Sequence, residues 1–217
     1  MSIGTATFFV FSIFLEFMDS GTVFEIELPF QMGYSYARYV DISHIIGRVW
    51  DSSMLKVYNH TSGSPLEDVE FLKSVDLLFG PTLLVRKPTR RTTGWKVVGK
   101  FLMDDDYIVP NFKTTHRFPY IVEDESKIDL WLIVALGKSE EPMPYDRISH
   151  LEQPVLQGID QIEARIVMEI LRNRGEDPLK FYEWEELEDH IKRVYLRMIN
   201  VPKYSDIPNL IRGVASE

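Results

Sequence analysis

Three acidic runs are the residues of this sequence best suited, by type and spacing, to do chemistry. They are Asp104-Asp105-Asp106, Glu123-Asp124-Glu125 and Glu183-Trp184-Glu185-Glu186. Two carboxyl groups support acid–base catalysis when different environments separate their pKa values. The first two runs fall in expected connections between strands, and the third falls on the expected solvent-facing side of a helix. The runs therefore predict exposed negative charge rather than a catalytic pair.

Histidine and cysteine do not indicate a catalytic or metal site either. The chain has five His and no Cys, which excludes disulfides, thiolate nucleophiles and thiolate metal ligands. No two His have metal-site spacing, and the Gly-x-Ser-x-Gly, phosphate-loop and dinucleotide-binding patterns are absent. The sequence therefore predicts no enzyme activity, no metal and no cofactor. The alternative is a small hydrolase whose site is assembled from scattered residues such as His116, Asp146 and His150.

The charge of the chain bears on the class of its partner. The net charge is −9, from 24 Lys and Arg against 33 Asp and Glu. A nucleic-acid-binding protein needs a basic surface that displaces counterions from phosphates, so nucleic acid is not an expected partner. The one dense basic stretch, residues 86–91, is expected to be an exposed connection. Acidic charge favours solubility, and it also complements a partner with a basic face.

The N-terminal segment, residues 1–18, contains an apolar run at residues 8–15 (FFVFSIFL). No Lys or Arg precedes the run, acidic residues follow it, and it is shorter than the roughly 20 residues that cross a bilayer. It is therefore either a buried strand or the product of a misassigned start, with translation beginning at Met18. No membrane partner is expected, and the absence of Cys agrees with a cytoplasmic protein.

Residues 19–150 carry the short β-branched and aromatic runs of a mainly β domain. Apolar and polar residues alternate over residues 22–28, and a second run follows at residues 34–41 after a short connection, which predicts a hairpin. Residues 66–79 fit a helical turn and a strand equally well. The pattern predicts an antiparallel β-sheet or a partly open barrel, with further strands at residues 49–58, 82–86, 95–100, 120–123 and 127–136.

Residues 151–217 change to a helical period. Apolar residues spaced three and four apart predict an amphipathic helix over residues 154–173, which Gly175 ends. Asp177 and Pro178 then form the N-cap and first turn of a second helix. Its apolar stripe consists of Phe181, Trp184, Leu187, Ile191, Val194 and Met198. Together the two helices predict a C-terminal αα-hairpin, so the expected fold class is α+β.

Two segments of the β part carry recognisable motifs. The first is Asp19-Ser20-Gly21-Thr22-Val23-Phe24-Glu25-Ile26-Glu27-Leu28-Pro29, followed by Gly33-Tyr34-Ser35-Tyr36-Ala37-Arg38. The second is Gly94-Trp95-Lys96-Val97-Val98-Gly99-Lys100, with Pro110 and Phe112 beyond it. In order and separation these segments resemble the Immunity protein 26 family of bacterial polymorphic toxin systems. The resemblance covers residues 19–112 and implies a protein that neutralises a toxin by binding it, with no catalytic residue.

The motif residues themselves indicate structure rather than an interface. Gly21 and Gly33 are expected in turns, and Phe24 and Ile26 in the core. Trp95 is expected to be a large buried ring whose indole N–H needs an acceptor.

These observations predict a protein that binds a cognate protein toxin, and the acidic charge favours a basic toxin such as a nuclease. Two alternatives remain open: the small hydrolase, and a non-catalytic scaffold that docks a partner through its C-terminal helices. The candidate contacts are the acidic runs of the β part, whose carboxylates would steer a cationic partner: Asp104, Asp105, Asp106, Glu123, Asp124 and Glu125.

Overall fold

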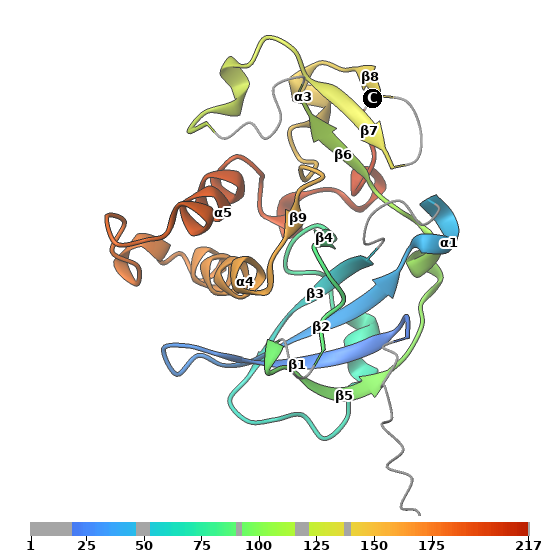
Figure 1. Ribbon diagram of the computed structural model, residues 1–217, viewed down its shortest axis with the longest axis vertical. Helices are drawn as coiled ribbons and strands as arrows, with labels where there is room; N and C mark the ends of the chain where they lie inside the picture. Colours follow the sequence, from blue (N-terminus) through green and yellow to red (C-terminus); the bar gives the residue numbers. More distant parts are fainter. Residues whose placement is uncertain (1–18, 47–52, 90–92, 116–121, 137–139, 217) are drawn as a thin grey trace, which may run out of the picture.

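The computed structural model describes residues 19–46, 53–89, 93–115, 122–136 and 140–216. The expectations for residues 1–18 and for His116 lie outside these ranges. Figure 1 shows a large sheet at one end of the molecule, a small sheet at the other, and helices α4 and α5 side by side on one flank. The fold is α+β, and neither sheet closes into a barrel.

The large sheet has six strands in the order β5-β1-β2-β3-β4-β9. All neighbouring pairs are antiparallel except β4 and β9, which pair in parallel. The predicted hairpin of residues 22–41 is confirmed as strands β1 and β2. The strand bounds are β1 Thr22–Leu28, β2 Gly33–Asp41, β3 Ser53–Ser62, β4 Thr82–Leu84, β5 Lys96–Lys100 and β9 Leu156–Gln157.

Both faces of β1 are covered, although its alternating sequence is typical of a half-buried strand. Phe24 and Ile26 pack into the main core against Ile162 and Ile166 of helix α4 (Ile159–Asn173). On the other face, Val23 packs in a second cluster with Tyr36, Leu72 and Phe101. Residues 66–79, which were ambiguous in sequence, contribute the 3-10 helix η1 (Glu70–Ser74) to this second face. The central strands are therefore buried on two sides.

The small sheet has three antiparallel strands in the order β6-β7-β8, which span Asn111–Thr114, Leu132–Ala135 and Glu140–Pro142. The strand expected at residues 127–136 is confirmed only in part, because Glu125–Lys127 forms the 3-10 helix η3. Where the structure describes residues 120–123, Val122 and Glu123 are not in a strand. Strands β6 and β8 are too short and too polar for sequence alternation to predict them.

The C-terminal helices pack together through Met168, Val194 and Met198. Helix α4 begins later than expected because Leu156 and Gln157 form strand β9, which completes the large sheet. Gly175, with φ 75°, follows its last turn as predicted. Asp177 and Pro178 begin only the 3-10 helix η4 (Pro178–Lys180), and α5 runs from Asp189 to Ile199. Repulsion among the intervening acidic side chains agrees with this interruption.

The remaining elements are short. Helix α1 is Ser43–Ile46 and helix α3 is Tyr145–Ile148; the 3-10 helices η2, η5 and η6 are Asp104–Tyr107, Tyr204–Asp206 and Asn209–Ile211. The predicted turn at Gly21 is confirmed, because its φ is 89°. A Cβ atom there would lie 2.5 Å from the carbonyl oxygen of Phe101. Any residue other than glycine would therefore be strained at this position.

Candidate partner-binding surface

The first acidic run lies in helix η2, where two of its three carboxylates have counterions. Asp106 is buried, and its Oδ1 accepts a 2.7 Å hydrogen bond from Nη2 of Arg38. Asp105 is about half exposed and lies 2.7 Å from Nζ of Lys56. Asp104 is exposed and takes no part in these pairs. The run is therefore the anionic half of an ion-pair cluster whose outer edge faces solvent.

The second acidic run divides in the same way. Glu125 is buried, lies 2.7 Å from Nζ of Lys113 and accepts a hydrogen bond from the amide of Gln153. Asp124 caps helix η3, and its hydrogen bond from Ser126 lowers the pKa of its carboxyl. Glu123 is exposed.

Of the six residues predicted to contact a partner, Asp106 and Glu125 are thus inside the protein. The structure places them as counterions of buried cations, so they present no side chain to a partner. The other four, Asp104, Asp105, Glu123 and Asp124, reach the surface.

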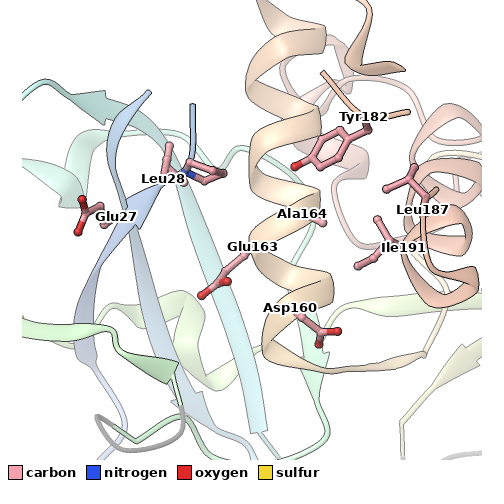
Figure 2. Close-up of a pocket in the computed structure, with 9 residues that line it drawn as sticks. Glu27, Leu28, Asp160, Glu163, Ala164, Tyr182, Leu187 and Ile191 are labelled. Carbon is pink, nitrogen blue, oxygen red and sulfur yellow. The ribbon is translucent and has the colours of Figure 1, made fainter. Parts of the chain in front are cut away.

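A cleft of about 530 Å³ is lined by residues from the end of strand β1, from helices α4 and α5 and from the segment between these helices. Figure 2 shows Leu187 and Ile191 directed towards α4, and Glu163 extending from α4 towards the strands. Leu28, Pro29, Ala164 and Tyr182 complete the apolar lining. Burial raises the pKa of Tyr182 to about 12, so its phenol is neutral. The cleft therefore joins apolar walls to the carboxylates of α4.

Those carboxylates belong to Asp160 and Glu163 in the first turns of α4. The indole Nε1 of Trp95 donates a 2.7 Å hydrogen bond to Oε1 of Glu163. Burial raises the pKa of Glu163, and the nearby Asp160 raises it further, although the bond from Trp95 opposes the shift. Asp160 is exposed and pairs with His190 when that imidazole is protonated. A second opening of about 460 Å³, lined by Arg86 and Thr93, borders the same two carboxylates.

An aromatic group lies beside the cleft, at the tip of the β1–β2 hairpin. The ring of Phe30 lies 5.7 Å from that of Phe181 and 5.6 Å from that of Tyr182. Phe30 is 50% exposed and Phe181 is 38% exposed. We call these three residues the aromatic platform. Sequence reasoning missed it, since its members come from a turn and an interrupted helix; a large aromatic residue within a tight turn was the available signal.

Of the alternative hydrolase site, the structure describes Asp146, in helix α3, and His150. Nε2 of His150 lies 3.0 Å and 2.8 Å from the carbonyl oxygens of Ile211 and Val214, so this ring holds the C-terminal segment. His116 lies outside the described residues. Across the ranges given above, no group of His, Asp and Glu has the arrangement of a metal site. None of the described helices combines the length and apolar character needed to span a membrane.

A comparison with profiles of known families tests the family resemblance of the two motifs. The Immunity protein 26 profile matches residues 19–135, more than half of the 217-residue chain. The chain belongs to the Immunity protein 26 family. No curated protein and no solved structure matches it significantly. The motif-based prediction of this family is therefore confirmed, and the matched region runs beyond residue 112 to the end of β7.

Membership gives this Immunity protein 26 chain an immunity function in general, and with it a toxin as the class of partner. The matched region contains η2, η3 and Phe30, while α4 and α5 follow it. Both acidic runs of the β part thus lie within the family region. The cleft instead combines Leu28 of that region with C-terminal residues that come after it.

Proposed function

We propose that this chain neutralises its toxin by stoichiometric binding, and that the toxin presents a basic surface, as a nuclease does. The observation that carries the proposal is the acidic excess of the surface. The described residues include 19 Lys and Arg and 30 Asp and Glu. Five of these cationic side chains and four of the anionic ones are buried, which leaves 14 cationic and 26 anionic side chains outside the described interior. Buried ion pairs therefore do not neutralise the acidic excess, and a basic partner would be complementary to it.

The four carboxylates of the two acidic runs that reach the surface are the proposed steering residues. They lie in or beside short 3-10 helices that connect strands, and loops held on a rigid scaffold are effective recognition elements. Such charges attract a cationic partner over about one Debye length, roughly 8–10 Å at physiological salt. Steering of this kind raises the association rate more than it slows dissociation.

The test uses Asp104→Asn with Glu123→Gln, because neither side chain takes part in the buried ion pairs. Association with the toxin domain encoded beside the gene is measured at low and high salt. We expect slower association with a weaker salt dependence, and a smaller change in dissociation. The matched control, Glu67→Gln with Glu141→Gln, removes two charges from other exposed positions. An unchanged association rate at low salt would remove the two runs from the mechanism.

Titrating the toxin with increasing amounts of the chain distinguishes inhibition by binding from a catalytic role. Stoichiometric binding predicts that toxin activity falls in proportion to added chain and disappears at a one-to-one ratio. Complete loss of toxin activity at a much lower ratio would instead show that the chain acts as an enzyme.

A further inference from the structure

The hairpin that carries Phe30 has a backbone conformation that its residues disfavour. Phe30 and Gln31 both have φ 57°, and the N–H of Met32 donates to the carbonyl oxygen of Pro29 at 3.2 Å. Two central residues with positive φ are typical of a type I′ turn, in which Asn and Gly are the usual residues. A bulky residue at positive φ is an outlier, and such outliers cluster at sites of function.

The strained turn places Phe30 where its side chain contributes little to the stability of the fold. Half of the side chain remains exposed, and its contacts are with Phe181 and Tyr182 on the segment between α4 and α5. An aromatic ring with free surface beside a second exposed ring is the kind of anchor that dominates binding energy at protein interfaces. The aromatic platform therefore points to a partner.

The cleft beside the platform has the chemistry of a site for a long cationic side chain. Its apolar walls suit the methylene stem of Arg or Lys, and Tyr182 offers a neutral aromatic ring. Oε2 of Glu163 accepts no hydrogen bond from any residue in the described ranges, while Oε1 is held by Trp95. A carboxylate with one oxygen fixed, and with no donor from the described residues on the other, can accept a charged N–H donor.

Charge around the cleft also favours a cation. The segment that follows the platform carries five exposed acidic residues, Glu183, Glu185, Glu186, Glu188 and Asp189. Lys192 lies near the ring of Trp184, 5.7 Å from its centroid. His190 competes for Asp160 only when it is protonated.

We propose that the aromatic platform and the cleft together form the anchor for a basic loop of the toxin. The platform takes an apolar side chain of that loop, and the cleft takes a neighbouring Arg or Lys on Glu163. Asp160 points to the α5 side of the helix and adds negative charge there (Figure 2). This inference rests on the proposed function, and it names the part of the surface where binding energy concentrates. The acidic runs at η2 and η3 act at longer range, before contact.

Three variants test the anchor without damaging the fold. Phe30→Asn removes the ring and suits the turn, so its Tm should equal or exceed that of the parent while its affinity for the toxin domain falls about tenfold or more. Glu163→Gln keeps an acceptor for Trp95 and removes the charge, with a similar expected loss. Gln31→Gly relaxes the same turn and keeps Phe30, so it should bind within about twofold of the parent, since it removes no contact.

The outcomes separate this inference from the proposed function. If the parent chain binds and neutralises the toxin domain, and Phe30→Asn and Glu163→Gln do so equally well, the anchor is wrong and the immunity mechanism stands. If the parent chain does not bind the toxin domain, both the anchor and the proposed function are wrong.

A short peptide gives a reading that does not depend on the toxin. A peptide with adjacent Arg and Leu should give a saturable shift of the Trp95 indole N–H resonance, because that group bonds to Glu163. The same peptide with citrulline in place of Arg, and the Glu163→Gln variant with the Arg peptide, should give no such shift. Equal shifts with Arg and citrulline, or none with Arg at millimolar peptide, would overturn the cation site.

Discussion

Trp95 and Glu163 join the two halves of the chain through a 2.7 Å hydrogen bond from the indole Nε1 to the carboxylate Oε1. Trp95 is buried immediately before β5, with its ring 5.6 Å from that of Phe24 in an edge-to-face arrangement. A buried indole N–H without an acceptor is destabilising. A tryptophan of the family region therefore relies on a helix that the family profile does not cover.

Replacing Trp95 should be among the most damaging single changes. Trp95→Ala should lower the free energy of unfolding by about 3–5 kcal/mol, because it leaves a cavity in the main core. Trp95→Phe keeps much of the ring, so it should cost less. Urea denaturation measures both changes. A Trp95→Ala variant as stable as the parent would show that the ring is not a core element.

The pH dependence of stability should change when Glu163 loses its charge. The ordinary pKa of this carboxyl is 4.5, and burial raises it in the folded state. The folded chain thus holds the proton more tightly than the unfolded chain, so this contribution is fully present below about pH 4.5 and is lost as pH rises through the folded-state pKa. The free energy of unfolding of the parent should therefore fall relative to Glu163→Gln as pH rises through that window. Parallel stability curves for the two proteins would contradict this.

Removing one partner of the buried ion pair of Lys113 and Glu125 should destabilise the protein more than replacing both with apolar residues. Both side chains are buried, and Lys113 also lies near the rings of Trp131 and Tyr145. Lys113→Met alone should cost about 3–5 kcal/mol, because an unpaired carboxylate remains in the interior. Adding Glu125→Leu should recover part of that loss in a double-mutant cycle.

An exposed ion pair provides the control for this cycle. Lys127 pairs with Asp124 at the surface, and Lys127→Ala should change stability by less than about 1 kcal/mol. Additive effects of the Lys113 and Glu125 substitutions would show that the buried pair is not coupled.

Relaxing the hairpin turn should stabilise the protein. Gln31→Gly removes about 1–2 kcal/mol of strain at a positive φ, and that gain exceeds the roughly 0.5–1 kcal/mol entropy cost of glycine. The expected net gain in the free energy of unfolding is therefore about 0.5–1 kcal/mol from these two effects. Gln31→Ala, which keeps the strain, should change stability much less. A Gly variant less stable than the Ala variant would show that the turn is not strained.

Local patterns in the sequence were sufficient for the elements whose determinants are local. The alternation of β1, the turn before β2 and the glycine after α4 all follow from a few neighbouring residues, and so does the need of Trp95 for an acceptor. That acceptor, Glu163, lies 68 positions away along the chain, so no local pattern around Trp95 could predict it.

The candidate site was predictable only in part, for the same reason. Asp106 looks like its exposed neighbour Asp104 in sequence, and only the distant Arg38 and Lys56 reveal that it is buried. Strand β9 is two residues long, so its pairing with β4 depends on the tertiary fold rather than on propensity.

Because β4 pairs in parallel with β9, the large sheet is completed late during synthesis of the chain. Leu83 of β4 is aligned with Leu156 of β9, and synthesis proceeds from the N-terminus. A nascent chain that has emerged as far as β5 already contains the other five strands, but β4 still presents an unpaired edge, a form prone to mispairing. Helix α4, which follows β9 directly, brings both the cover of the main core and the acceptor for Trp95. The large sheet can therefore be completed only after residues 156 and 157 have been synthesised, and a product truncated before residue 156 would leave the β4 edge unpaired.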